Sequence, residues 1–196
     1  MAQRRSFTGL IVAGVIVLLV IISASWYVNT RNSLVRLDEQ VTASWSEVEN
    51  QLQRRSDLIP NLVNTVRGFA EQEEEIFTSI ADARARLAGA ETVGETAESY
   101  GELQSALSRL LVVVENYPQL RSNENFIRLQ DELAGTENRI AVSRRRYNET
   151  VQSYNTRVRT FPTALIASGL GFDQREYFEV EEEDMEVPEV DFGSEN

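Results

Sequence analysis

A chain of 196 residues is long enough for one folded domain with additional segments. It carries 31 acidic and 19 basic residues, and this net charge of −12 argues against nucleic-acid binding, which requires a basic surface. Cysteine and histidine are absent, which excludes disulfides, thiolate catalysis and the usual zinc sites, and no P-loop or nucleophile-elbow motif is present. We therefore predict no catalytic, metal-binding or cofactor-binding residue.

Residues 9–28, GLIVAGVIVLLVIISASWYV, follow an N-terminal segment (1–8) and contain no charge. Twenty helical residues at ~1.5 Å each span roughly 30 Å, the hydrocarbon thickness of a bilayer. Trp26 and Tyr27 lie at the end of the segment, where amphipathic rings favour the membrane interface. The segment predicts a single-pass anchor in the lipid bilayer. The alternative is a cleaved signal peptide, because Ser23–Ser25 offers small residues for cleavage.

The charges beside the anchor predict its orientation. Arg4, Arg5 and the amino terminus precede it, whereas Arg31 and Arg36 follow it. The more positive flank tends to stay in the cytoplasm. We therefore expect the region after the anchor to lie outside the cytoplasm.

Apolar residues at steps of three and four predict four helices after the anchor. Thr92 and Glu95 are spaced as a capping box before the third helix, Ser122 is a candidate cap for the fourth, and Pro118 and Pro162 end these two helices. Short connections favour an antiparallel arrangement, so the predicted fold is an all-α, up-and-down four-helix bundle. The four stripes cover Leu34–Leu52, Ile59–Leu87, Leu103–Tyr117 and Phe126–Phe161.

The stretch QLQRRSDLIPNLV, residues 51–63, interrupts the pattern between the first two stripes. Arg54 and Arg55 suit the negative end of a helix, and Asp57 is a preferred N-cap. Pro60 would then fall in a first turn, where it avoids the cost of about 3 kcal/mol that it has in a helix interior. We therefore predict a turn at Asp57. The alternative is one long kinked helix, because the heptad phase continues across Pro60.

Three stretches carry a resemblance to a known family: NSLVRLDEQVTASWSEVENQLQRRSDLIPNLVNTVRGFA (32–70), LVVVENYPQLRSNENFIRLQDELAGTENRIAVSRRRYNETVQSYNTRVRTFP (111–162) and GFDQREYFEV (171–180). In these stretches the sequence resembles the LemA family of bacterial membrane-anchored proteins. The resemblance implies an N-terminal anchor in the bacterial inner membrane, a four-helix bundle over residues 29–162 and no established catalytic activity.

Polar residues beside the fourth apolar stripe are the clearest candidate site in the helices. We interpret them as a network that fixes helix register, with Arg55 as a further candidate member, and a small-ligand site is the alternative. The runs Glu71–Glu75 and Arg144–Arg146 are typical of solvated faces, the second alternatively of an anionic-lipid or partner contact. The polar band comprises Thr136, Glu137, Asn138, Arg139, Asn148 and Asn155.

The C-terminal segment, residues 163–196, is predicted to be a flexible acidic tail. Residues 173–196 hold 11 acidic residues and one arginine, a composition typical of disorder. Three apolar-acidic-apolar triplets recur in it, as expected for an extended strand that binds the sheet edge of a partner. A purely solubilising tail is the alternative. The candidate partner-binding residues are Phe178, Val180, Met185, Val187, Val190 and Phe192.

These features predict a non-enzymatic membrane scaffold or adaptor. It would present a coiled-coil-like bundle and an acidic tail to protein partners, including other membrane proteins or further copies of itself. A self-assembling protein that organises or remodels membranes is the main alternative, and an enzyme that uses carboxylates is less favoured.

Overall fold

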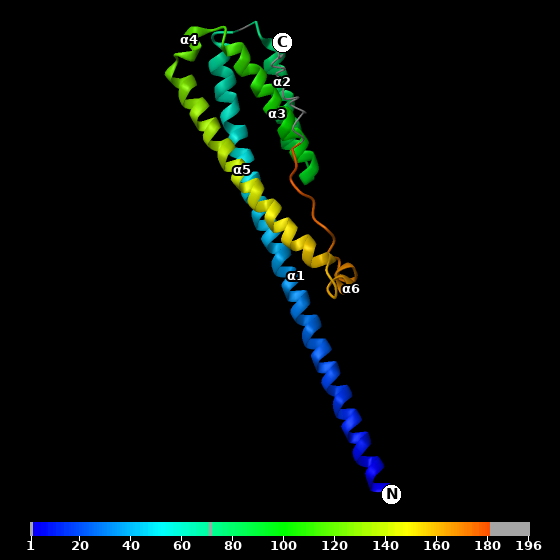
Figure 1. Cartoon of the computed structure of the whole chain (residues 1–196). Helices are drawn as coiled ribbons and strands as arrows, with labels where there is room; N and C mark the ends of the chain where they lie inside the picture. Colours follow the sequence, from blue (N-terminus) through cyan, green and yellow to red (C-terminus); the bar gives the residue numbers. More distant parts are fainter. Residues whose placement is uncertain (1, 71, 181–196) are drawn as a thin grey trace, which may run out of the picture. The chain divides into compact units, whose positions relative to one another are not determined.

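A computed structural model describes residues 2–70 and 72–180, and the side chains of this range from residue 9 onward. No strand occurs among these residues, so the predicted all-α class is confirmed. Figure 1 shows the helices in chain order: α1 (Ala2–Arg67), α2 (Glu74–Gly89), α3 (Val93–Val114), α4 (Pro118–Arg121), α5 (Glu124–Arg159), α6 (Ala164–Ala167) and the 3₁₀ helix η1 (Ser168–Leu170).

The chain forms two compact units, and α1 and α5 contribute to both. Unit 1 comprises the residues up to 51 together with residues 140–176. Unit 2 comprises residues 52–139 together with residues 177–180.

Unit 2 has one apolar core shared by α1, α2, α3 and α5. Its α3 begins with the predicted capping box: Thr92 Oγ1 accepts a hydrogen bond from the Glu95 amide, and the Glu95 carboxylate accepts one from the Thr92 amide. The predicted cap at Ser122 is wrong, because the amides of the first turn of α5 donate to Asn123 Oδ1 instead. The largest fully buried core side chains of this unit include Ile59, Leu62, Ile80, Leu103, Leu110, Leu120 and Phe126.

The predicted turn at Asp57 is wrong, because α1 continues past it with Pro60 inside the helix. The side chains of Leu52, Ile59 and Val66 stand one heptad apart and are all buried. Burying such a side chain contributes about 1.5–3 kcal/mol, so three together outweigh the cost of about 3 kcal/mol of an interior proline. The helix breaks only after Arg67.

Unit 1 pairs α1 with the second half of α5 in an antiparallel arrangement. The rings of Trp45 and Tyr147 lie 5.1 Å apart, and Arg146 forms an ion pair of 3.0 Å with Glu47. The α1 helix is long and apolar enough near its N-terminus to cross a membrane, and residues 9–28 are exposed. The buried apolar side chains of the pair include Leu34, Val41, Val48, Tyr147, Val151 and Tyr154.

The expected disorder of the C-terminal segment does not extend to residues 163–180. This stretch contains α6 and η1, followed by extended backbone from residue 172. The side chains of Asp173, Glu176 and Glu179 are exposed, so their charges face water, while backbone groups of the same stretch bond to α5. Residues 181–196 lie outside the described part of the chain.

Candidate functional site

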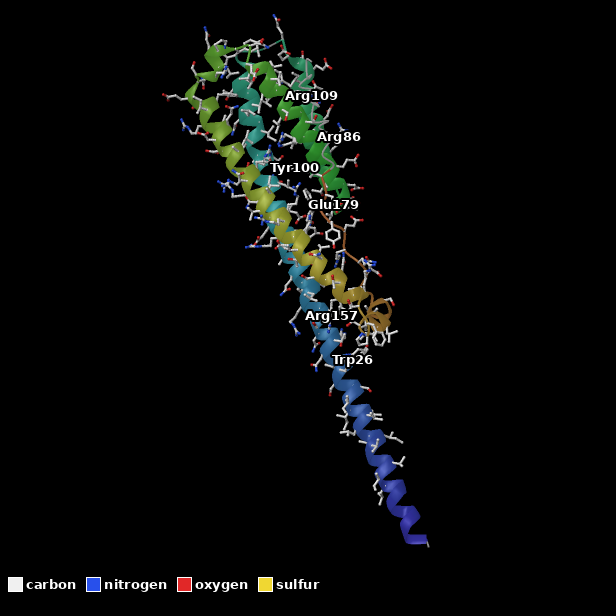
Figure 2. The ribbon with its side chains drawn as sticks, in the orientation of Figure 1. Trp26, Arg86, Tyr100, Arg109, Arg157 and Glu179 are labelled. Carbon is white, nitrogen blue, oxygen red and sulfur yellow. The ribbon has the colours of Figure 1, made fainter. Side chains whose placement is uncertain are left out.

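A polar cluster lies within the apolar core of unit 2. It consists of Arg55 from α1, Tyr100 and Gln104 from α3, and Glu137 from α5, and we call it the core polar cluster. The Arg55 guanidinium forms an ion pair with Glu137 and donates a hydrogen bond of 2.6 Å to Gln104 Oε1. The Tyr100 hydroxyl donates to the same Glu137 oxygen, and the guanidinium carbon of Arg55 lies 5.7 Å from the centre of the Tyr100 ring. Figure 2 labels Tyr100 on α3. The cluster therefore ties three helices together at one level.

Arg55 is the unusual member of this cluster, because it is only 6% exposed. A buried charge is costly unless it is paired and hydrogen-bonded, and Glu137 and Gln104 satisfy the two terminal nitrogens of Arg55, whereas its buried Nε has no hydrogen-bond partner among the described residues. The Glu137 side chain is 36% exposed, so its carboxylate keeps contact with water. The arrangement can fix helix register, because its hydrogen bonds and ion pair join three helices. Arg55 and Glu137 were predicted from the sequence, but Tyr100 and Gln104 were not, because no polar residue stood out beside the apolar stripe of their helix.

The remaining residues of the predicted polar band do not join this cluster. Thr136 is buried, and its hydroxyl donates to the Leu133 carbonyl one turn earlier. The side chains of Asn138 and Arg139 are exposed. Asn155 belongs to unit 1. The band is therefore not one network.

In unit 1, Asn155 holds the extended segment that follows η1. Its Nδ2 donates to the Arg175 carbonyl and its Oδ1 accepts from the Arg175 amide, both at 2.8 Å. The side-chain amide thus pairs with the backbone as a neighbouring strand would. The Arg175 guanidinium then donates two hydrogen bonds, of 3.0 and 2.7 Å, to Asp38 Oδ1 on α1. This contact closes the segment over the helix pair.

Two tyrosines one heptad apart on α5 complete this attachment. The Tyr154 hydroxyl donates to the Asp173 carbonyl at 2.9 Å, and the Tyr147 hydroxyl donates to the Glu176 carbonyl at 2.8 Å. Burial raises the pKa of Tyr147 to about 12, because the tyrosinate would lose water there, and the neighbouring Arg175 only partly opposes this. Both tyrosines were predicted as members of the apolar stripe. A hydroxyl that is buried there needs an acceptor, and this need was the available sign that a backbone segment packs against the stripe.

Two of the six predicted partner-binding residues lie against unit 2 of the same chain. Phe178 is 1% exposed, and its ring centre lies 6.2 Å from that of Tyr100. Val180 Cγ1 would stand 3.3 Å from a Cβ on Gly101, so a larger residue at position 101 would have to displace it. Between them Glu179 is exposed, and Figure 2 labels it on the extended segment. The predicted alternation is present, but it faces the chain's own α3. Met185, Val187, Val190 and Phe192 lie outside the described residues.

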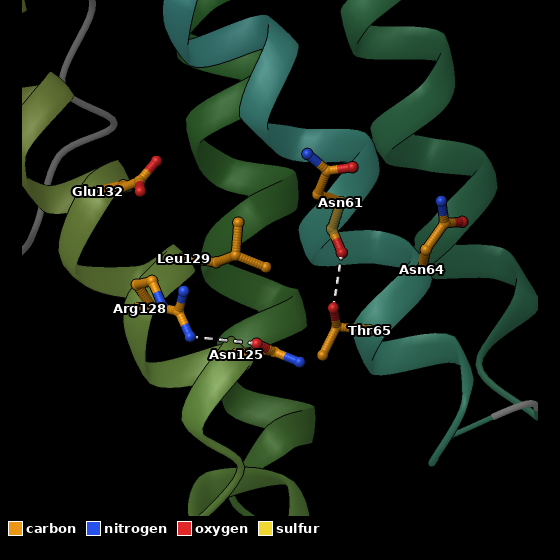
Figure 3. Close-up of a pocket in the computed structure, with 7 residues that line it drawn as sticks. All are labelled: Asn61, Asn64, Thr65, Asn125, Arg128, Leu129 and Glu132. Atoms are coloured by element: carbon orange, nitrogen blue, oxygen red, sulfur yellow. Dashed lines mark hydrogen bonds between the residues drawn. The ribbon is translucent and has the colours of Figure 1, made fainter.

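Unit 2 also has an open pocket of about 380 Å³ on its surface, shown in Figure 3, which sequence reasoning missed. The hydroxyl of Thr65 donates to the Asn61 carbonyl, and the Arg128 guanidinium donates to Asn125 Oδ1. Amides and one exposed pair of opposite charges suit polar contacts with a partner surface, and they provide no nucleophile with an adjacent base. Among the described residues, no group of three acidic side chains is arranged to hold a metal ion. The pocket is lined by Asn61, Asn64, Thr65, Asn125, Arg128, Leu129 and Glu132.

Comparison with known proteins connects this architecture to a family. The model of the LemA family matches residues 44–192. Magnetosome protein MamQ 2 of Paramagnetospirillum magneticum is 28% identical over 174 residues, which cover 76% of this chain and 64% of that protein. Magnetosome protein MamQ of Magnetospirillum gryphiswaldense is 27% identical over 173 residues, or 75% of this chain and 64% of that protein. Protein LemA of Metamycoplasma hominis is 24% identical over 169 residues, or 84% of this chain and 77% of that protein.

The chain thus spans 64% of the length of the magnetosome relatives, and none of the three names denotes an enzyme. The family match begins within α1, before Arg55 of the core polar cluster, and ends beyond Phe178. The similarity to these relatives, together with the apolar start of α1, fits a protein associated with a membrane. The earlier resemblance is confirmed: the chain belongs to the LemA family.

Proposed function

We propose that this protein is a non-enzymatic, membrane-anchored helical scaffold that presents its helices to protein partners. The observation that carries the proposal is the composition of α1. One helix contains an exposed, uncharged apolar stretch at residues 9–28 and then a stripe of buried core residues. The same element would therefore both cross the bilayer and build the folded units.

The connection between anchor and fold supports a scaffold because it contains no hinge. Residues 28–51 are helical throughout and include neither glycine nor proline. A helix of this length extends about 35 Å, and its continuous backbone hydrogen bonds resist bending. A partner bound to this helix pair would be held at a defined distance from the membrane.

Exposed apolar residues at one end of unit 2 support a partner-binding surface. Phe69 follows α1, Leu111 and Val112 belong to the last turn of α3, and Ile127 belongs to the first turn of α5. Their exposures range from 39% for Phe69 to 65% for Val112. We call these four residues the loop-end patch. Large apolar side chains that are exposed near one end of a folded unit are candidates for contacts with another protein.

Photo-cross-linking from the loop-end patch tests the scaffold proposal. A photoreactive residue at Val112 is expected to give a discrete adduct in intact membranes. The matched control is Val142, an exposed valine on α5 in unit 1. An adduct with a different protein at Val112 and none at Val142 supports the scaffold. An adduct of twice the chain mass would favour self-assembly, and equal diffuse labelling at both sites would contradict a specific surface.

The anchor itself is tested by extraction from membranes. The full chain is expected to stay with the membrane at alkaline pH, whereas a chain without residues 2–28 is expected in the soluble fraction. Recovery of the full chain in that fraction would contradict an integral anchor.

We further propose that the folded units lie outside the cytoplasm of a bacterial cell, anchored in its inner membrane. Three positive charges precede the anchor, counting the amino terminus, and two follow it closely. Protease added to spheroplasts should therefore digest the units before lysis. Protection until lysis would reverse the proposed orientation.

A further inference from the structure

An uncharged stretch, residues 160–172 with the sequence TFPTALIASGLGF, links α5 to the extended C-terminal segment. It contains α6 and η1. Phe161 is 76% exposed and Leu165 is 70% exposed, more than any other large apolar side chain that the structure describes, those at residues 9–28 included. In contrast, Thr163 and Ala167 are each 1% exposed. The stretch is therefore anchored on one side and presents two large apolar groups on the other.

The antiparallel contacts of unit 1 place this stretch along α1. Trp45 contacts Tyr147 and Glu47 pairs with Arg146, so the residue numbers of opposed positions add up to 192 or 193. The same register sets Leu34 opposite Val158 and Thr30 opposite position 162.

Burial agrees with this register. Leu34 and Thr30 are 0% and 2% exposed, although residues 9–28 just before them are all exposed. Val158 and Thr163, near the positions opposite them, are also buried. The register therefore places Phe161, just after the end of α5 at Arg159, near the level of residues 31–32, about one helical turn from Val28, where the apolar segment ends. Figure 2 shows Trp26 and Arg157 near the end of the helix pair at which α6 lies.

The charges nearest the end of the apolar segment are positive, and the first acidic residues, Asp38 on α1 and Asp173 after the uncharged stretch, lie beyond them. Arg157 and Arg159 precede the uncharged stretch, and Arg31 and Arg36 follow the anchor on α1, all four exposed. No acidic residue occurs in residues 9–37 or 157–172, although the chain as a whole is strongly acidic. A band of arginines next to exposed apolar and aromatic groups is the arrangement that binds phosphate headgroups above acyl chains.

We propose that residues 160–172 form an interfacial foot on the bilayer that residues 9–28 cross. Phe161 and Leu165 enter the boundary between headgroups and acyl chains beside Trp26 and Tyr27, and the arginines face the lipid phosphates. We assign lipid as the partner of these side chains, because they lie near the level at which the apolar segment ends. The foot gives unit 1 a second membrane contact, which restricts tilting of the helix pair. This inference rests on the proposed anchor.

Single-cysteine labelling of the full chain tests the foot, since the chain has no cysteine of its own. An environment-sensitive fluorophore is placed at Phe161→Cys or Leu165→Cys in lipid nanodiscs that hold one copy each. Val142→Cys is the matched control, because Val142 is exposed and lies 19 residues before Phe161, about 28 Å along a helix. Leu18→Cys reports on the anchor. Helicity by circular dichroism verifies that each variant folds.

The expected result is that the labels at positions 161, 165 and 18 are quenched by spin-labelled lipid and several-fold less by iodide than the label at 142. Iodide quenching at 161 and 165 equal to that at 142, with position 18 still shielded, would overturn the foot and leave the anchor intact. Iodide access at position 18 as well would overturn both. Shielding at 161 and 165 that appears only in discs with two copies would overturn the foot in favour of a contact between copies.

Discussion

The buried Arg55 makes the core polar cluster sensitive to loss of one partner. Arg55→Met is expected to destabilise the protein by about 2–4 kcal/mol, because Glu137 loses its ion pair and Gln104 loses its hydrogen-bond donor. Adding Glu137→Leu is expected to recover part of this loss, since both charges are then removed, although the Tyr100 hydroxyl loses its acceptor. Urea unfolding of the detergent-solubilised chain measures both variants. A double variant no more stable than Arg55→Met would contradict the coupling.

Tyr147 predicts the behaviour of unit 1 in alkaline solution. Its pKa is 10.0 in an unfolded chain and about 12 in the folded one, so the folded state holds the proton more tightly. The resulting stability is fully present below pH 10 and is lost as the pH rises from 10 towards 12. Tyr147→Phe should cost ~0.5–1.5 kcal/mol at neutral pH through the lost hydrogen bond, and it should flatten this alkaline decline. Unfolding midpoints across this pH range check both effects. A decline of the same steepness in Tyr147→Phe would assign it to other groups.

At the scale of a single helix, Pro60 tests whether α1 is continuous, because it lies inside the helix without ending it. Pro60→Ala restores a backbone donor and removes a clash with the preceding turn, so it is expected to stabilise the fold by about 1–3 kcal/mol. Asp57→Ala is the control and is expected to be nearly neutral, because Asp57 only accepts a hydrogen bond from the Gln53 side chain on the surface. If Pro60→Ala were neutral and Asp57→Ala destabilising, a helix start at Asp57 would replace the continuous α1.

Helix ends were predicted correctly where the capping residues close in sequence and the packing against other helices favoured the same end. The Thr92–Glu95 capping box was predictable because its two hydrogen bonds form between residues close in sequence. The Asp57 signal was equally local, but the heptad from Leu52 to Val66 packs against other helices and outweighs it. A cap is worth about 1 kcal/mol, whereas a buried stripe is worth several times more.

The sites were less predictable than the helices because their partners are distant in sequence. Arg55 and Glu137 could be singled out as polar groups beside apolar stripes, but nothing in the sequence paired them across 82 positions. Likewise, Asn155 was recognised without its partner, the backbone of Arg175. The acidic composition near Phe178 indicated disorder, because composition does not record the order of the residues. Since Phe178 and Glu179 point to opposite sides, the ring packs while the carboxylate stays in water.

At the scale of the whole molecule, the C-terminal segment divides into a part that packs and a part that is proposed to bind partners. A chain that ends after Phe172 loses the attachment of residues 173–176 and the burial of Phe178, so its melting temperature is expected to fall. A chain that ends after Val180 keeps all these contacts and is expected to melt as the full chain does. If residues 181–196 contain the docking strand, this second chain should also lose partner capture. Equal melting temperatures for both truncated chains would contradict the described packing.

The continuous helix α1 joins the proposed anchor to the helices of the folded units. Hydrogen exchange of the full chain in lipid nanodiscs, followed by mass spectrometry, tests this continuity most directly. A continuous α1 predicts slow exchange from residue 9 to residue 67 without a gap. Fast exchange at residues 29–33 would separate the anchor from the fold, and fast exchange around Asp57 would restore the turn; either result would contradict a single helix.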